Sequence, residues 1–418
     1  MRLLIAGTIG RVSHKSAGEG LSRHAKGSPS EVLRASLQLG LTSFGGPIAH
    51  LGYFNREYVQ KRHWLSAKDF AALVSLCQLL PGPTSSQVGF LIGLRRAGIF
   101  GALAAWIGFT LPSAVLMYAF AILAPRASGP LMQAVLHGLM LTAAVVVSRA
   151  VWSMARTSCA DWQRAIIALA AAAILSFHSN GVFQLIALAG GAAAGSIVCR
   201  YLKHAVIELP AATHSRMPWI ALAVFCGLLI ALPILGSLAP HGPIALANIF
   251  YRAGAFVFGG GHVVLPLLRD ALVPGHWISD EGFLAGYGFA QAMPGPLFTV
   301  AAYLGAASAP MHASLPWGLL ALIAIFLPGL LLSVVGLALW SRLARMPTAF
   351  AMLAGINAAV VGVLGAALYN PIGVTAIHSV MDVAVVVIGF VLLQWRRVPP
   401  ILVAALCVAA SLVMRWAA

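Results

Sequence analysis

The stretch Ser43-Phe44-Gly45-Gly46-Pro47, followed by Gln78-Leu79-Leu80-Pro81-Gly82-Pro83, occurs a second time in this chain. The second copy reads Phe258-Gly259-Gly260-Gly261 and then Gln291-Ala292-Met293-Pro294-Gly295-Pro296. Each copy lies within apolar sequence, and two prolines that flank a glycine prevent a regular helix. A helix-breaking pattern that recurs in both halves of an apolar chain is typical of a membrane transporter built from two repeats, with its site at the breaks.

The sequence between the two parts of the motif is also repeated. His63-Trp64-x-Ser66 in the first copy matches His276-Trp277-x-Ser279 in the second, and Phe70 matches Phe283. The correspondence therefore extends over a whole structural unit and is not confined to short glycine-rich strings.

The composition excludes a soluble fold. The chain has 418 residues, of which 60% are hydrophobic and 9% charged, whereas soluble domains carry roughly 25% charged residues. Its apolar stretches exceed the roughly 20 residues that cross a bilayer. We expect an all-α polytopic membrane protein with apolar segments at about 32–54, 68–93, 97–124, 130–153, 163–177, 180–199, 218–239, 244–269, 282–309, 315–340, 348–369, 374–394 and 398–416.

The charges and cysteines limit the possible partners. Lysine and arginine outnumber the acidic residues by 26 to 10, but they lie in short loops, where a positive-inside topology explains them better than nucleic acid does. The five cysteines show no CxxC pattern, so neither a disulfide nor a metal is implied. No nucleotide-binding or hydrolytic motif is present, and we expect no cofactor and no enzymatic activity.

The basic loops predict the topology of the first repeat. Arg56, Lys61, Arg62 and Lys68 follow the first apolar segment, and Arg95 and Arg96 follow the second. Both loops are cytoplasmic only if each segment enters the membrane and returns at its break. Each broken segment is then a re-entrant hairpin or one discontinuous span, and the alternative overall is thirteen ordinary spans. Ser28-Pro29-x-Glu31 predicts the start of the first helix.

The second repeat shows the opposite charge pattern. Its corresponding loop, residues 270–281, contains no lysine or arginine, whereas Arg342, Arg345, Arg396 and Arg397 follow later segments. The segment at 218–239 acts as an unpaired crossing, so we expect two inverted-topology repeats with broken or re-entrant helices and a linker transmembrane helix. The expected division is a basic cytoplasmic tail at 1–28, a first repeat at 29–200, a linker at 201–242 and a second repeat at 243–418.

The breaks suggest an anion site. A broken helix exposes main-chain amides and the positive end of a helix dipole, and both favour an oxyanion. The residues after the first break are hydroxyl and amide donors, which makes the first copy the better-equipped site, with the second mainly completing the gate. The candidate substrate-binding residues are Ser43, Gly45, Gly46, His50, Gln78, Gly82, Thr84, Ser85, Ser86, Arg252, Gly259, Gly260, His262, Gln291, Gly295 and Thr299.

Other residues have structural or ambiguous interpretations. His50 and His262 are equally well explained as histidines hydrogen-bonded in a helix interface. Arg252 lies within an apolar run and is either functional or extends its side chain to an interface. Gly191-x-x-x-Gly195 is typical of close helix packing. The acidic residues fall at segment ends, except Asp382, which is the pattern of an anion pathway and not of a cation pathway.

These motifs resemble those of the chromate transporter family, in its long two-repeat type. The resemblance rests on Phe44-Gly45-Gly46-Pro47, Leu80-Pro81-Gly82-Pro83 and their counterparts at 258–261 and 293–296, and it covers most of the chain beyond the tail. It implies a bacterial inner-membrane protein that exports chromate, an antiporter without a settled counter-ion, with sulfate as a competitor. Gly261 stands where the first copy has Pro47, so the halves need not contribute equally.

Two other functions remain open from the sequence. A passive channel for tetrahedral oxyanions would use the same broken helices without coupling to a second ion. A lipid-modifying membrane enzyme would need a convergent acid–base or metal set, and the few acids argue against it. The expected partners are the oxyanion and the lipid bilayer, and the sequence leaves a homodimer open.

Overall fold

The computed structural model describes residues 27–124, 129–178, 181–201, 216–258, 261–343, 346–395 and 398–417. Within these ranges all regular structure is helical, and six helices are long and apolar enough to cross a membrane. These are α4 (Thr84–Leu123), α5 (Pro130–Ser158), α7 (Gly181–Val198), α8 (Met217–Ser237), α13 (Ser314–Leu343) and α14 (Pro347–Ala367). The expected all-α polytopic fold is confirmed.

Several residues used in the charge argument lie outside these ranges. They are most of the N-terminal tail, together with Arg345, Arg396 and Arg397. The helices themselves and the ion pairs at their ends indicate the topology instead.

The first repeat begins with a broken segment. α1 (Pro29–Thr42) starts where expected, since the Ser28 side chain accepts a hydrogen bond from the Glu31 amide at 3.2 Å. The chain then turns through Gly45 and Gly46, whose φ angles of +100° and +80° suit glycine. It continues as α2 (Gly46–Phe54) and the π-helical η1 (Asn55–Lys61).

A second broken segment follows. α3 (Ala67–Leu79) ends before Pro81-Gly82-Pro83, and α4 begins directly after this break. α4 is itself kinked at Ala97 and Gly98, so its first part ends at Arg96 and its second part runs to Leu123.

Ion pairs bring the outer ends of these helices together. Arg96, at the end of the first part of α4, pairs with Glu31 in the first turn of α1 at 3.2 Å. Arg95 approaches Asp69, in the first turn of α3, at 4.0 Å. The Trp64 indole N–H also donates to Glu31, at 3.2 Å. Since α1, α3 and the first part of α4 have their outer ends at one place, the segments of the first repeat are re-entrant hairpins.

The second repeat reproduces this arrangement. α9 (Pro243–Phe256) and, after the break, η3 (Gly261–Val263) with α10 (Val264–Leu272) correspond to α1 and α2. α11 (Asp280–Ala292) corresponds to α3, and η4 (Leu297–Thr299) with α12 (Val300–Ala307) corresponds to the first part of α4. η5 (Met311–Ala313) then leads into α13.

The conserved backbone of the two copies explains the repeated His-Trp-x-Ser string. His63 and His276 both have positive φ, at +50° and +57°. Ser66 and Ser279 cap the following helices α3 and α11 through their side chains. Each string therefore reverses the chain and starts the next helix in the same way.

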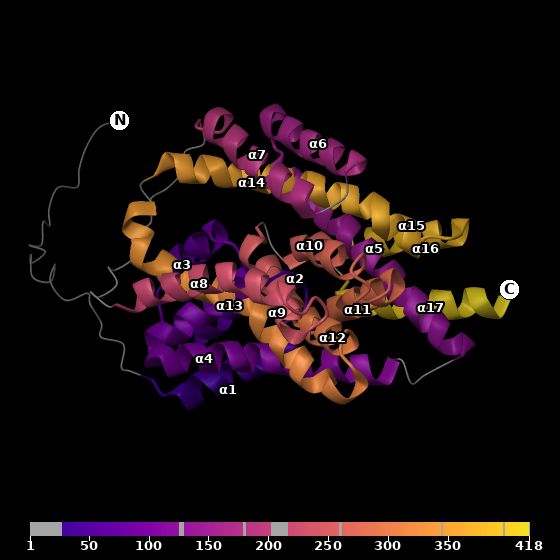
Figure 1. Ribbon diagram of the computed structural model, residues 1–418, viewed down its shortest axis with the longest axis horizontal. Helices are drawn as coiled ribbons and strands as arrows, with labels where there is room; N and C mark the ends of the chain where they lie inside the picture. The colour runs from indigo at the N-terminus through magenta and orange to yellow at the C-terminus, as the bar shows by residue number, and fades with distance from the viewer. Residues whose placement is uncertain are drawn as a thin grey trace, which may run out of the picture.

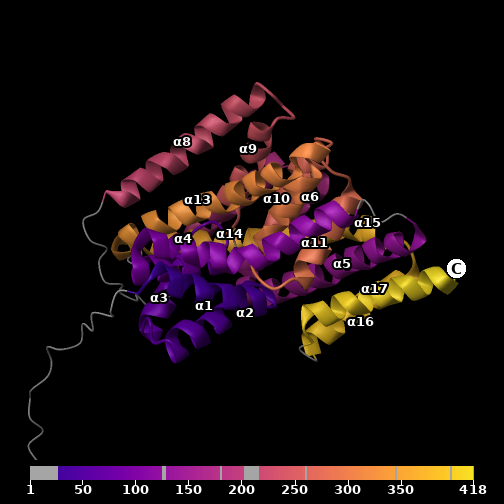
Figure 2. The same ribbon diagram turned by 90° about the horizontal axis from the view of Figure 1, so that it is seen from below.

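The crossings between the two sets of hairpins invert the second repeat. Five helices lie between the two sets of hairpins: the second part of α4, then α5, α6 (Trp162–Phe177), α7 and α8. Four of them are long enough to cross a membrane, and we infer that the shorter α6, which packs against α7, is the fifth crossing. Because this number is odd, the hairpins of the second repeat enter from the opposite face. α8 is the linker helix, and it lies at the edge of the molecule against α9 and α13 (Figure 2).

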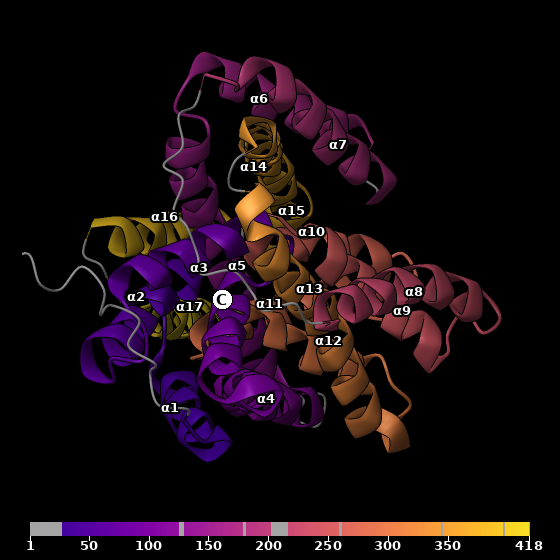
Figure 3. The ribbon, with the colours of Figure 1, turned by 90° about the vertical axis from the view of Figure 1, so that its left-hand side faces the viewer.

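The terminal hairpins of the repeats are exchanged. α6 and α7, from the first repeat, pack against α14 of the second (Figures 1 and 3). α16 (Val380–Trp395) and α17 (Pro400–Ala417) pack against α5 of the first repeat (Figure 2). A Cβ added at Gly195 would lie 2.5 Å from the Ala351 carbonyl oxygen. This confirms the prediction that the Gly191-x-x-x-Gly195 string allows close helix packing, here between α7 and α14.

Candidate functional site

The two Pro-Gly-Pro breaks are joined by a reciprocal pair of hydrogen bonds. The Gly82 amide donates to the Val257 carbonyl, just before the glycines of the second copy, at 2.8 Å. The Gly295 amide donates to the Ser43 carbonyl, just before the glycines of the first copy, at 2.9 Å. The Pro-Gly-Pro break of each repeat is therefore hydrogen-bonded to the start of the glycine turn of the other repeat. The four breaks meet inside the molecule.

These bonds correct one expectation from the sequence. We expected the amides of both breaks to be free for an anion, and for Gly82 and Gly295 this is wrong because the amides serve the contact between repeats. Carbonyl oxygens beside the first Pro-Gly-Pro break also have hydrogen-bond partners. The Gln87 side-chain amide donates to the Pro81 carbonyl at 2.8 Å and to the Gly329 carbonyl at 2.9 Å. Any anion must use other donors.

A cavity of about 730 Å³ adjoins the breaks. The first repeat supplies the Gly-Gly-Pro turn and neighbouring residues of α5, and the second supplies the end of α11 and the residues around its breaks. Its lining includes Gly45, Gly46, Pro47, Ala49, Arg149, Ser153, Gly261, His262, Gln291, Met293, Gly295 and Leu297. The cavity therefore combines the glycine turn of the first copy with the Pro-Gly-Pro break of the second.

Arg149 is the one cationic side chain among the lining residues that the structure describes. It lies on α5, and no acidic residue is in the same lining. An arginine within a membrane-spanning helix is costly unless it faces a cavity and binds a partner. The arrangement gives the cavity a positive field that attracts an anion.

The polar side chains of the second repeat are connected within this cavity. His262 Nδ1 lies 2.9 Å from the Tyr287 hydroxyl and 3.4 Å from the Gln291 side-chain nitrogen. Tyr287 is itself fully buried on α11. This packing holds His262 and Gln291 in place beside the break.

The structure brings some of the predicted site residues together and leaves others apart. Gly45, Gly46, His262, Gln291 and Gly295 line the cavity. Gly259 and Gly260 lie outside the described residues. The remaining candidates are not among the lining residues: Ser43, His50, Gln78, Gly82, Thr84, Ser85, Ser86, Arg252 and Thr299.

Several of these form a separate buried polar cluster beside the first break. His50 Nδ1 lies 3.3 Å from the Ser85 hydroxyl, and both residues are buried. His50 Nε2 and the Ser43 and Ser86 hydroxyls have no hydrogen-bond partner among the described residues. Thr299, in contrast, is satisfied, because its hydroxyl donates to the Pro296 carbonyl at 2.8 Å.

Gln78 and Arg252 lie elsewhere. Gln78 is exposed at the end of α3, and Arg252 is exposed on α9. The structure therefore supports extension of Arg252 to an interface more than a role in this cavity.

Sequence reasoning missed Arg149. It is not among the candidates predicted from the sequence, although it falls inside the apolar segment at 130–153. That position within an apolar run was the signal, because intramembrane arginines are rare and functional.

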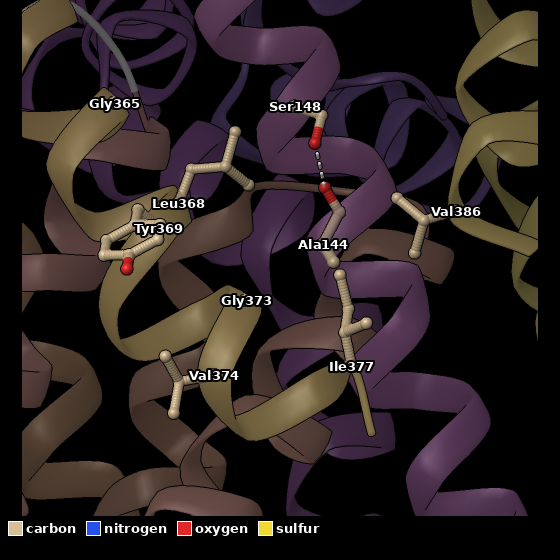
Figure 4. A pocket seen from close by; sticks show the side chains of 9 residues that line it. All are labelled: Ala144, Ser148, Gly365, Leu368, Tyr369, Gly373, Val374, Ile377 and Val386. Carbon is tan, nitrogen blue, oxygen red and sulfur yellow. Dashed lines mark hydrogen bonds between the residues drawn. The ribbon is translucent and has the colours of Figure 1, made fainter. Parts of the chain in front are cut away.

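A second cavity is a poorer candidate for an anion. It measures about 520 Å³ and lies between α5, η6 (Leu368–Gly373), α15 (Val374–Ala376) and α16. Figure 4 shows its lining, which is mostly aliphatic. The Ser148 hydroxyl donates to the Ala144 carbonyl at 2.7 Å and is not available to a ligand.

Comparison with known proteins identifies the family of this chain. Residues 30–196 and 244–412 each match the family described as chromate transporter. A chromate transport protein of Cupriavidus metallidurans is 26% identical over 393 residues, covering 88% of this chain and 89% of that protein. A chromate transport protein of Pseudomonas aeruginosa is 28% identical over 347 residues, covering 81% and 80%. No solved structure matches the chain.

The two matched segments coincide with the two sets of hairpins and their following helices, and together they cover more than half of the chain. Proteins of this family are transporters and not enzymes. The chain is a multi-pass membrane protein that belongs to the chromate transporter family.

Proposed function

We propose that this protein exports chromate across the bacterial inner membrane as a secondary active transporter, with sulfate as a competing analogue. The observation that carries the proposal is the cavity that Arg149 lines together with the glycine turn of one repeat and the Pro-Gly-Pro break of the other. The family membership and the names of the two relatives supply the substrate.

The chemistry of the cavity suits a tetrahedral dianion. Arg149 provides charge-assisted hydrogen bonds, which are about twice as strong as neutral ones. Gln291 and Ser153 add neutral polar groups, and the lack of a Cβ at Gly45 and Gly46 lets the ligand approach the main chain. The absence of a carboxylate from the described lining avoids repulsion of the anion.

The paired breaks suggest how access alternates. The bonds Gly82–Val257 and Gly295–Ser43 join the repeats near their centre, so one repeat can rock against the other around this contact. The cavity is lined by residues near the C-terminal end of α5, including Ser153. The basic loops favour a cytoplasmic position for that end and for the N-terminus, so under this proposal the cavity receives its substrate from the side that export requires.

Vesicle transport tests this function. Everted membrane vesicles that contain the protein should accumulate chromate above its electrochemical equilibrium when an ion gradient is imposed. Sulfate should compete, and an ionophore that collapses the gradient should stop accumulation. Movement that only follows the chromate gradient would instead indicate a channel.

Changing the repeated glutamines should have unequal effects. Gln291→Ala removes a neutral polar group from the cavity and should raise the KM for chromate about 5- to 15-fold, the loss of one hydrogen bond worth about 1–1.5 kcal/mol. Gln78→Ala is the matched control, because Gln78 occupies the same motif position but is exposed at the end of α3. Equal losses in the two variants would contradict the assignment of the cavity.

Cysteine labelling tests the inverted topology and the orientation. Lys61→Cys and Glu281→Cys place exposed thiols at corresponding outer ends of the first and second repeats. In a cysteine-depleted background, an impermeant maleimide added to intact cells should label position 281 and not position 61. Labelling of both positions from one side would refute the inversion.

A further inference from the structure

Two histidines and an aspartate converge at the other end of α5, away from the cavity. His137 lies on α5 of the first repeat, His378 follows α15, and Asp382 is in the first turn of α16 of the second repeat. One ligand atom from each residue lies within 4.8 Å of the others. From His137 to Arg149 the helix rises about 18 Å, so this cluster is separate from the anion cavity.

Asp382 is held in place by one of its two oxygens. Oδ2 accepts hydrogen bonds from the His378 amide at 3.0 Å, the Ser379 amide at 2.9 Å and the Ser379 hydroxyl at 3.0 Å. The residue is 2% exposed. Because the main chain fixes the carboxylate, its position does not depend on a bound ligand.

The other oxygen of Asp382 is left without a donor. Oδ1 has no hydrogen-bond partner among the described residues, and His137 Nε2 lies 3.4 Å from it. A buried carboxylate oxygen without a partner is costly. A cation beside Oδ1 would remove that cost.

The two histidines can supply the remaining ligands. His137 Nδ1 lies 3.1 Å from the Ser411 hydroxyl on α17, and Nε2 lies 3.2 Å from the Ala376 carbonyl oxygen and 3.4 Å from Asp382 Oδ1. In the tautomer that donates the Nδ1 proton to Ser411, the Nε2 lone pair is directed at the space between these two oxygens, where a cation would be bound by all three atoms. Such a second hydrogen bond is how metal-binding histidines are normally oriented. His378 stacks on the His137 ring at 5.6 Å between centroids and is exposed, which gives an ion a path from solvent.

We propose that His137, His378 and Asp382 form a binding site for a divalent transition-metal cation of the zinc class. Two imidazoles and one carboxylate, with water in the open position, are ligands suited to zinc and its neighbours and not to magnesium or calcium. The bound ion joins α5 of the first repeat to α16 of the second, and so clamps the exchanged C-terminal hairpin onto its partner.

Metal binding to the purified full-length protein tests the site. After treatment with a chelator, the detergent-solubilised transporter should bind one zinc ion per chain at this site in a calorimetric titration at pH 7.5. Zinc should also raise the melting temperature, because it binds only the folded arrangement.

Two variants identify the ligands. His378→Ala changes an exposed side chain and should weaken zinc binding at least about tenfold, with the zinc-dependent rise in melting temperature lost. His178→Ala is the control, because His178 is an exposed histidine at the end of α6, on the other exchanged hairpin. It should bind zinc like the parent protein.

His137→Ala supplies a second measurement from the other repeat and should show the same loss. The proposal is overturned if the parent protein binds no zinc, if His378→Ala and His137→Ala bind it unchanged, or if magnesium and calcium bind with equal affinity. Histidines in the N-terminal tail remain in all of these proteins, so any binding there is the same throughout.

Discussion

Replacing Arg149 with alanine is expected to lower chromate transport about 10- to 100-fold. The guanidinium is the one cationic group among the described lining residues of the cavity, and a hydrogen bond to a charged group contributes about 1.5–3 kcal/mol. Arg149→Lys keeps the charge but loses the planar fork that binds two oxygens. Its transport rate should therefore lie between those of the parent protein and Arg149→Ala. The measurement is initial uptake rate against chromate concentration in everted vesicles.

Arg156→Ala is the matched control for this prediction. Arg156 is exposed in the last turn of the same helix and is not among the lining residues. It should transport at close to the parent rate. If Arg149→Ala retained full transport, or if Arg156→Ala lost as much, the cavity would not be the substrate site.

Substituting either glycine of the Pro-Gly-Pro breaks should abolish transport and destabilise the protein. Gly82 and Gly295 have φ angles of +117° and +96°, where a side chain costs about 1–3 kcal/mol. An added Cβ would lie 2.8 Å from the Gly329 Cα in Gly82→Ala and 2.7 Å from the Ser113 hydroxyl in Gly295→Ala. Both changes displace the amides that join the repeats.

The readouts are the melting temperature of the solubilised protein and vesicle uptake. Gly227→Ala on α8 is the control, because an added Cβ there meets no atom within 4 Å and alanine favours helix. It should leave both measurements unchanged or slightly improved. Near-normal stability and uptake in Gly82→Ala and Gly295→Ala would contradict the interlocked breaks.

Local signals in the sequence predicted the hairpins well. The Ser28 cap, the repeated His-Trp-x-Ser string and the glycine turns act through residues close in the chain, and the structure shows each of them. The basic loops correctly indicated that the first two segments return to one side. The sequence alone did not decide between hairpins and discontinuous spans. The ion pair between Glu31 and Arg96 in the structure decides for hairpins.

Contacts between the repeats could not be predicted in this way. A free amide at Gly82 follows from the broken helix alone, and only the folded chain shows that Val257, far away in sequence, accepts its hydrogen bond. The same limit applies to the site. The sequence favoured the donors after the first break, but the cavity instead joins the turn at Gly45 to the break at Gly295.

The exchange of the terminal hairpins explains why the sequence did not predict the cluster of His137, His378 and Asp382. His137 and Asp382 meet only because α16 and α17 pack on α5 of the opposite repeat. Spacing rules for metal ligands apply to residues on one element or neighbouring elements, and they do not detect ligands from separate halves of a chain.

The most direct test of the account is the position of chromium in a structure of the protein with chromate bound. We predict that the chromium lies in the cavity between Arg149 and the turn at Gly45 and Gly46, beside Gln291. Chromium found instead at the start of α4, against Thr84, Ser85 and Ser86, would show that the first break binds the anion by itself and would contradict the shared site.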